Sequence, residues 1–264
     1  MLRADDALDL QGLAARYRAG GLRPRQLVEG LLERIERRGD DKVWIHRLPR
    51  EALLARAAEL EERGPEGLPL YGIPFAIKDN IDLAGQPTTA ACPGFRYTAQ
   101  ETAPVVERLL AAGAIALGKT NLDQFATGLA GVRSPYGVPG NSFNPAFVPG
   151  GSSSGSAIAV AAGLASFSLG TDTAGSGRVP AAFNNLVGYK PTCGLLSARG
   201  MVPACRSLDC ISIFALTADD AAAVLHAARG YDAADPYSRR EPQYRLPATP
   251  GSFAGCRVGV PRRG

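Results

Sequence analysis

The chain has 264 residues, of which 45% are hydrophobic and 20% are charged. This composition excludes intrinsic disorder, collagen-like structure and coiled coils, because the chain holds enough apolar residues for a buried core. The 29 basic and 25 acidic residues are scattered along the sequence, so the concentrated positive charge of a nucleic-acid-binding protein is missing. We therefore expect a folded protein with no nucleic-acid partner.

The cysteines and the N-terminus indicate the cellular compartment. The five cysteines are odd in number and form no Cys-x-x-Cys pair, which excludes a zinc site of that type and a disulfide framework. Acidic residues stand near the N-terminus where a signal peptide has an apolar run, and no stretch reaches the ~18 consecutive apolar residues of a membrane span. These features predict a cytoplasmic protein with no membrane partner.

In chain order, the sequence begins with helical patterns and continues with alternating helices and strands. Residues 5–64 have the apolar periodicity of helices, and Pro24 stands at the first turn of one of them. The alternation that follows predicts an α/β fold. It consists of strands at 71–77, 114–117, 167–170 and 187–189 and helices at 102–112, 157–164 and 217–229, the last capped by Thr217.

Two glycine- and serine-rich segments, 150–156 and 170–178, stand out within and after a long irregular stretch at 128–156. Small residues let backbone N–H groups approach a ligand, and a turn that leads into a helix favours an anion or an oxyanion. Taken alone, each segment is also compatible with a flexible connection. The two segments together are candidates for the functional site.

One motif in the first segment points to a histidine-dependent hydrolase, and we reject it. Gly151-x-Ser153-x-Gly155 has the pattern of a nucleophile elbow, which requires a histidine base. The chain has only His46 and His226, and both stand in segments where a structural role is expected. Since no Ser-x-x-Lys motif occurs either, the remaining possibility is a serine activated by a lysine distant in sequence.

Lys78 is the lysine best placed for such a role. Only four of the 29 basic residues are lysines, and a lysine, unlike an arginine, can lose its proton. Lys78 ends the apolar run 72–77, where desolvation would lower the pKa of its amine toward that of a general base. An ion pair between Lys78 and Asp79 at the end of a strand is the equally supported alternative.

Four motifs carry a resemblance to a known family: Gly72–Asn80 (GIPFAIKDN), Gly118–Asn121 (GKTN), Gly150–Gly155 (GGSSSG) and Gly170–Ser176 (GTDTAGS). In this order and spacing the chain resembles the amidase signature family over about Asp5 to Gly264. The resemblance implies a mixed β-sheet core with helices on both faces. It implies that 1–264 is the N-terminal portion of a longer amidase domain, with an assembled triad and an incomplete substrate pocket. Its parts would be a helical segment 1–64, a catalytic α/β core 65–230, a connection 231–251 and the start of a further strand at 256–260.

The resemblance also implies a Ser-cis-Ser-Lys triad. Ser176 would be the nucleophile, Ser152 the bridging serine after a cis peptide bond, and Lys78 the base. Asp172 and Arg178 would pair and brace the loop between them, with an anionic substrate as the alternative partner of Arg178. The oxyanion hole would consist of the backbone N–H groups of Thr173, Ala174, Gly175 and Ser176.

Within the family, Thr171 to Ala215 is most similar to allophanate hydrolases, with Gly177-Arg178 and the segment Cys205–Asp209 as the discriminating details. This similarity implies hydrolysis of allophanate (N-carboxyurea) to ammonia and carbon dioxide or bicarbonate in urea, triazine or cyanurate degradation. Hydrolysis of this small-molecule amide would need no metal and no organic cofactor. The full-length protein would be a homodimer. The alternatives are the A subunit of a glutamyl-tRNA amidotransferase, which typically carries Ser-Ile-Arg at this loop, a general amidase, or a catalytically inactive scaffold.

Overall fold

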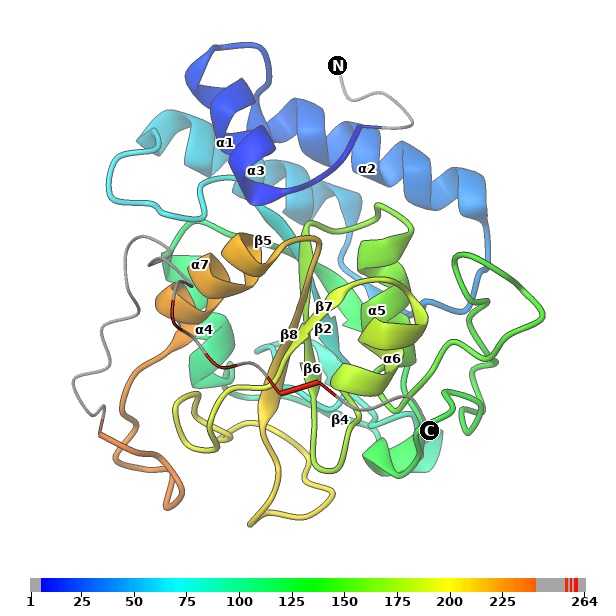
Figure 1. Cartoon of the computed structure of the whole chain (residues 1–264). Helices are drawn as coiled ribbons and strands as arrows, with labels where there is room; N and C mark the ends of the chain where they lie inside the picture. Colours follow the sequence, from blue (N-terminus) through cyan, green and yellow to red (C-terminus); the bar gives the residue numbers. More distant parts are fainter. Residues whose placement is uncertain (1–5, 241–254, 256, 258, 261–264) are drawn as a thin grey trace.

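The computed structural model describes residues 6–240, 255, 257 and 259–260 (Figure 1). Within these residues the chain forms seven α-helices and eight strands. The helices are α1 (Leu10–Arg18), α2 (Pro24–Arg38), α3 (Arg50–Arg63), α4 (Pro104–Ala111), α5 (Ser154–Ala161), α6 (Arg178–Phe183) and α7 (Ala218–Ala228). The strands are β1 (Trp44–Arg47), β2 (Pro74–Lys78), β3 (Pro87–Thr88), β4 (Tyr97–Thr98), β5 (Ile115–Thr120), β6 (Phe167–Thr171), β7 (Val187–Tyr189) and β8 (Ile211–Ala215).

Six of the strands form one mixed sheet in the order β1-β5-β2-β6-β8-β7, which confirms the predicted sheet type. Strand β2 lies in the middle and runs parallel to β5 and β6, whereas the other pairs are antiparallel. The three parallel strands are buried along their whole length and end at the same edge, with Lys78, Thr120 and Thr171 as their last residues. This edge, outside the carboxyl ends of parallel strands, is where α/β proteins bind ligands.

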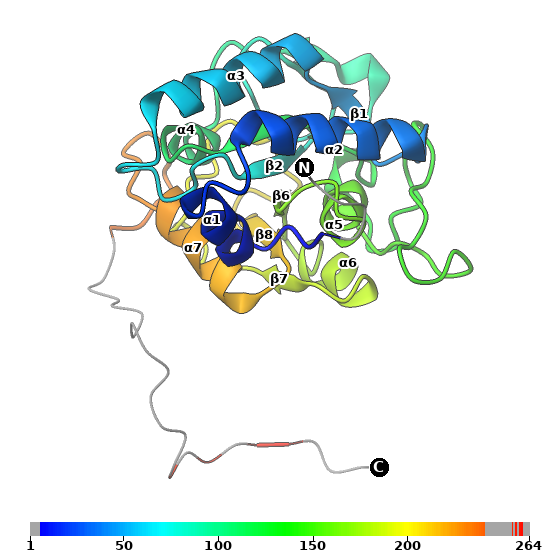
Figure 2. The ribbon, with the colours of Figure 1, turned by 90° about the horizontal axis from the view of Figure 1, so that it is seen from above.

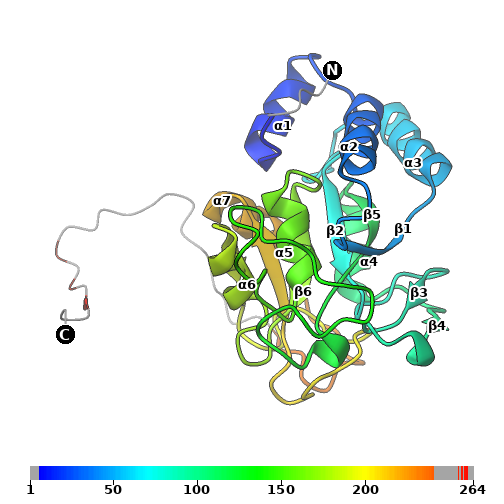
Figure 3. The ribbon, with the colours of Figure 1, turned by 90° about the vertical axis from the view of Figure 1, so that its right-hand side faces the viewer.

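Helices cover both faces of the sheet, as the sequence predicted. Seen from above, α5 and α6 lie on one face and α4 and α7 lie on the other (Figure 2). Helices α1, α2 and α3 lie together at the end of the sheet opposite the long loops (Figures 1 and 3). A stacked pair of rings, Phe75 of β2 and Phe167 of β6, joins the central strands in the core between these layers.

Helix α5 packs closely on the sheet because its residues are small. A Cβ atom at Gly155 would lie 2.5 Å from the backbone nitrogen of Asn121 and 2.5 Å from the backbone oxygen of Val43, so this approach requires glycine. The close contact brings the start of α5, with Ser152 just before it, to the carboxyl edge of the parallel strands.

The N-terminal segment 5–64 is not helical throughout, which corrects the prediction for this region. Strand β1 separates α2 from α3 and pairs antiparallel with β5. Its four residues are too few to establish a period of two, and the pairing that stabilises it comes from a strand about 70 residues later in the chain. A local sequence pattern therefore could not reveal this strand.

Strand β8 and helix α6 are further elements that the sequence analysis did not predict. Strand β8 is fully buried and lies between β6 and β7, with all five of its residues paired to β6. Helix α6 begins at Arg178, two residues after Ser176, and α5 begins at Ser154, three residues before its predicted start. Glycine and serine disfavour helices, so both starts depend on tertiary packing rather than on local propensity.

Other predicted boundaries agree with the structure. Helix α2 begins at Pro24, and the Thr217 hydroxyl caps α7 by accepting a hydrogen bond from the Asp220 N–H. Residues 231–240 form no helix or strand, whereas 241–251 and most of the predicted strand at 256–260 lie outside the described residues. No helix in the described part of the chain is long and apolar enough to cross a lipid bilayer.

Candidate active site

The carboxyl edge of the parallel strands brings the predicted triad residues together. Lys78 is the last residue of β2, and Ser152 stands in the loop that enters α5. Ser176 lies in the turn between β6 and α6, where its backbone oxygen accepts a hydrogen bond from the Ser153 N–H at 3.2 Å. The two serine-bearing turns are thus adjacent, although they are 24 residues apart in sequence.

The Lys78 amine is fully buried and contacts two hydroxyl groups. Its Nζ atom lies 2.8 Å from the Ser152 Oγ atom and 2.7 Å from the Thr171 Oγ1 atom. Burial lowers the pKa of Lys78 to about 7, although the carboxylates of Asp123, Asp172 and Asp209 act in the opposite direction. A large fraction of this amine is therefore neutral near neutral pH and can accept a proton.

Asp79 is the ion-pair partner of Lys119 rather than of Lys78, which decides between the two interpretations of Lys78. The Lys119 Nζ atom lies 3.3 Å from the Asp79 Oδ1 atom, and both side chains are fully buried. The other carboxylate oxygen of Asp79 accepts a hydrogen bond from the Thr89 N–H at 3.0 Å. The ion pair between Lys78 and Asp79 is absent, and Lys78 has no carboxylate partner among the described residues.

The loop before Ser152 is held by a buried carboxylate that the sequence analysis missed. The peptide bond between Gly151 and Ser152 is cis, as expected. Asp123 accepts hydrogen bonds from the N–H groups of Gly131 at 3.0 Å and Arg133 at 2.7 Å, and its own N–H donates to the Ser152 carbonyl at 2.9 Å. A Cβ atom at Gly151 would lie 2.2 Å from this carboxylate, so the glycine allows the close approach.

The loop that carries Ser176 is organised around the buried Asp172 carboxylate, which pairs with Arg178 as predicted. Two nitrogens of the Arg178 guanidinium each lie 2.9 Å from one of the two carboxylate oxygens. Burial alone would raise the pKa of Asp172, but hydrogen bonds from Arg178 and from the Gly177 N–H outweigh burial and lower it. The charged carboxylate therefore persists at neutral pH and holds the turn.

The predicted oxyanion N–H groups divide into two kinds. Among the described residues, those of Thr173, Ala174 and Ser176 have no hydrogen-bond acceptor, whereas that of Gly175 donates to the Asp172 carboxylate at 2.7 Å. The Ser176 side chain is almost buried, and its hydroxyl lies 3.4 Å from the Gly128 carbonyl oxygen. Three of the four predicted N–H groups are thus without an acceptor among the described residues, and the fourth braces the turn.

Thr171 is a further polar contact of the site that the sequence analysis did not single out. Its hydroxyl contacts the Lys78 amine, and the Asn80 side-chain amide lies 3.5 Å from the same oxygen. Both residues lie inside motifs quoted for the family resemblance, so these motifs could have pointed to Thr171 and Asn80 as residues of the site. Their pairing across β2 and β6 depends on the strand register, which no local pattern contains.

The two histidines lie in structural contacts, as the sequence predicted. The His46 Nε2 atom lies 2.8 Å from the Gln86 Oε1 atom, and the His226 Nδ1 atom lies 2.7 Å from the Ala222 carbonyl oxygen on its own helix. Across the residues that the structure describes, no group of three or more His, Cys, Asp or Glu side chains is arranged to hold a metal ion.

Comparison with known families agrees with this geometry. The profile of the family described as Amidase matches residues 26–263, which is most of the chain. The chain belongs to the amidase family. This amidase is 57% identical over 197 residues to the urea amidolyase of Saccharomyces cerevisiae, a match that covers 74% of this chain and 11% of the yeast protein.

A second curated relative and a solved structure complete the comparison. The A subunit of the glutamyl-tRNA(Gln) amidotransferase of Chlorobium luteolum is 46% identical over 236 residues, which cover 87% of this chain and 48% of that protein. The structure of Kluyveromyces lactis allophanate hydrolase superposes with a TM-score of 0.82 at 48% identity, covering 89% of this chain and 39% of that one. The amidase chain therefore spans less than half the length of each of these relatives.

Proposed function

We propose that this amidase hydrolyses the amide bond of allophanate, with Ser176 as nucleophile, Ser152 as bridging serine and Lys78 as general base. The observation that carries the proposal is the buried Lys78 amine, 2.8 Å from the Ser152 hydroxyl and paired with no carboxylate among the described residues. A lysine in this state serves as a base rather than as a fixed cation. The similarity to a urea amidolyase and to an allophanate hydrolase supports the substrate class.

The first half of the reaction forms a tetrahedral intermediate on Ser176. The Ser176 oxygen attacks the amide carbonyl carbon while its proton passes to Ser152, whose own proton passes to the neutral Lys78 amine. The charge that develops on the carbonyl oxygen is stabilised by the N–H groups of Thr173, Ala174 and Ser176. Each well-placed donor of this kind contributes roughly 10²–10³ in rate.

The second half releases both products. The C–N bond breaks as the proton returns from Lys78 through Ser152 to the departing nitrogen, which leaves as ammonia and gives the acyl-enzyme on Ser176. A water molecule then attacks the acyl carbon and gives its proton to the same relay, which restores the Ser176 hydroxyl. The two serines and the lysine end in their starting protonation states, so the cycle needs no external base.

The main alternative is the activity of a glutamyl-tRNA amidotransferase, and residue 177 argues against it. The A subunits of these enzymes typically carry isoleucine after the loop serine, where this chain has Gly177. A Cβ atom at Gly177 would lie 2.5 Å from the Ser212 Oγ atom and 2.7 Å from its Cβ atom. Because strand β8 fixes Ser212, the turn of this chain is fitted to glycine and to the pattern of allophanate hydrolases.

We extend the proposal to the cellular setting. The protein would act on a small amide in the cytoplasm, without nucleic-acid or membrane partners and without a cofactor, and the full-length protein would be a homodimer. The four cysteines among the described residues are all free thiols, which supports a reducing compartment.

The experiment is to measure ammonia release from allophanate and from glutamine by the wild type and by Ser176→Ala. We expect release from allophanate, none from glutamine, and complete loss in Ser176→Ala, with full retention in the exposed control Ser142→Ala. A labelled acylating inhibitor should attach to Ser176. Attachment to Ser153 or Cys205, or activity in Ser176→Ala, would contradict the assignment.

A further inference from the structure

Asp123 is a fully buried carboxylate beside the proposed proton relay, and the reaction steps proposed for that relay do not use it. Strand β5 ends at Thr120, which is paired in register with Lys78, and Asp123 follows three residues later. The Asp123 N–H donates to the Ser152 carbonyl at 2.9 Å, and the Ser152 hydroxyl lies 2.8 Å from the Lys78 amine. Asp123 and Lys78 therefore contact two different groups of the same serine.

The Asp123 carboxylate also anchors the loop 128–133 against both serine-bearing turns. It accepts hydrogen bonds from two backbone N–H groups of this loop. One carbonyl of the loop accepts a hydrogen bond from the Gly151 N–H at 2.8 Å, and another lies 3.4 Å from the Ser176 hydroxyl. A change at Asp123 is therefore transmitted to the turns of Ser152 and Ser176 together.

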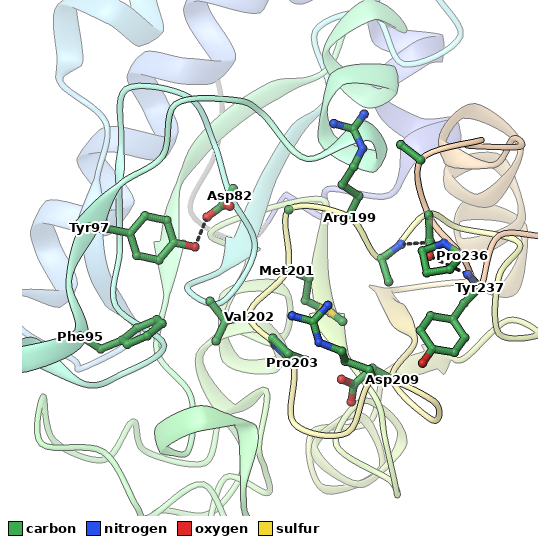
Figure 4. Close-up of a pocket in the computed structure, with 15 residues that line it drawn as sticks. Asp82, Phe95, Tyr97, Arg199, Met201, Val202, Pro203, Asp209, Pro236 and Tyr237 are labelled. Carbon is green, nitrogen blue, oxygen red and sulfur yellow. Dashed lines mark hydrogen bonds between the residues drawn. The ribbon is translucent and has the colours of Figure 1, made fainter.

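Three carboxylates act on the buried Lys78 amine, and Asp123 acts most strongly. Asp172 is neutralised by the Arg178 guanidinium. Asp209 lines a cavity of about 410 Å³ (Figure 4), which has room for water molecules that screen its charge. Asp123 is fully buried and has no cation partner among the described residues, so neither a counter-ion nor solvent attenuates its charge.

The other charged groups next to Lys78 form a pair of their own. Asp79 follows Lys78 in the chain, but its carboxylate faces Lys119 at 3.3 Å, and these two opposite charges largely cancel. Among the described residues, Asp123 is thus the carboxylate whose charge reaches the Lys78 amine least attenuated.

We propose that Asp123 is a positioning residue of the relay, which fixes the Ser152 turn and supplies the buried negative charge against which Lys78 takes up its proton. The inference rests on the proposed function, because it concerns the same proton transfer. A carboxylate in direct contact favours the charged form of a lysine, as Asp79 does for Lys119. Across one intervening residue the attraction is weaker, so Lys78 can be neutral before the reaction and is still stabilised when Ser152 passes it a proton.

The pKa of Lys78 can be measured without turnover, because the chain contains only four lysines. In protein labelled isotopically at lysine, single lysine-to-arginine variants assign the side-chain NMR resonances, which are then followed as the pH is raised. We expect the wild-type Lys78 resonance to titrate near pH 7. Asp123→Asn should lower this pKa by about 1, the low end of the effect of an opposite charge, because the charge that favours the protonated amine is removed.

Two controls accompany this titration. The matched variant Asp209→Asn removes the water-screened carboxylate and should lower the pKa of Lys78 less than Asp123→Asn does. The Lys42 resonance, from a side chain that is 40% exposed, should not move in either variant. Because the asparagine amide would face one of the two N–H donors, Asp123→Ser is the second variant. Serine keeps an acceptor oxygen and leaves room for water, and it should shift the pKa of Lys78 in the same direction.

Kinetics provide a readout that a merely structural role would not move. In Asp123→Asn the rise of kcat/KM for allophanate should shift to lower pH by the same amount as the NMR titration. Its plateau should fall roughly tenfold, because Lys78 is then a weaker and less well placed base. Urea unfolding checks that the variants are folded.

An unchanged or raised pKa of Lys78 in Asp123→Asn and Asp123→Ser would overturn the inference, as would an equal shift in Asp209→Asn. A lower plateau without a shift in pH would make Asp123 a purely structural residue. Failure of the proposed function is a separate result, in which the wild type releases no ammonia from allophanate while the pKa of Lys78 still depends on Asp123.

Discussion

Two buried lysines in neighbouring strands have opposite surroundings. Lys78 ends β2 and Lys119 lies in β5, where it is paired in register with Ile77, so their side chains leave the sheet in opposite directions. Lys119 meets the Asp79 carboxylate, whereas Lys78 meets the hydroxyls of Ser152 and Thr171. The same residue type in the same sheet thus has a charged partner in one case and neutral partners in the other.

This difference decides what each amine can do. Burial lowers the pKa of Lys119 as well, but the Asp79 carboxylate opposes the shift and stabilises the charged form. For Lys78 burial lowers the pKa to about 7, and the nearest contacts are neutral. Burial without a carboxylate partner allows a lysine to act as a base. The comparison therefore supports the proposed proton transfer by Lys78 and a structural role for Lys119.

The largest expected effect is the loss of activity on replacing Lys78. Lys78→Arg should lower kcat/KM for ammonia release by about 10²–10⁴, the range of general-base catalysis, and Lys78→Met should do the same. Arginine keeps the positive charge but does not lose its proton at neutral pH, so it cannot accept a proton from Ser152. An arginine variant with activity close to that of the wild type would show that Lys78 is a structural cation.

Replacing the other lysine should mainly change stability. Lys119→Met leaves the buried Asp79 carboxylate without its cation, and we expect the free energy of unfolding in urea to fall by about 3–5 kcal/mol. The double variant Lys119→Met, Asp79→Asn should lose less free energy of unfolding than Lys119→Met alone, because the unpaired carboxylate charge is removed. An equal loss of stability in Lys78→Met and Lys119→Met would contradict the different roles of the two lysines.

The smallest expected effect concerns the second hydroxyl on Lys78. Thr171→Val removes a hydrogen bond worth about 1 kcal/mol that orients the amine toward Ser152, so kcat should fall roughly fivefold. Thr171→Ser keeps the hydroxyl and should restore most of the rate. Equal activity of the valine and serine variants would mean that Ser152 alone positions the amine.

The sequence was informative where chemistry depends on short motifs. Lys78 could be selected as a candidate base because it follows an apolar run, whereas the roles of Ser152 and Ser176 came from the family resemblance of the glycine- and serine-rich segments that contain them. The same segments allowed the Asp172–Arg178 pair to be predicted across only six residues. The mixed sheet and its helical layers followed from the alternation of elements and from the family resemblance.

Contacts between distant segments could not be predicted in this way. The Asp79–Lys119 ion pair joins residues 40 positions apart, and the Lys78–Thr171 contact joins residues 93 positions apart. Both require the strand order β5-β2-β6, which the sequence pattern does not contain. For the same reason, the sequence could not distinguish an unpaired Lys78 from a Lys78 that forms an ion pair with Asp79. The three-dimensional arrangement of the strands was required to distinguish them.

The pH dependence of kcat/KM for allophanate tests the central claim most directly, because this quantity reports the ionisation of the free enzyme. Lys78 must be neutral to accept the proton of Ser152, so protonation at low pH removes activity. We predict that kcat/KM rises with pH through an apparent pKa of about 7 and then levels off. A profile that is flat through this region, or that falls as the pH increases, would contradict the assignment of Lys78 as a neutral base.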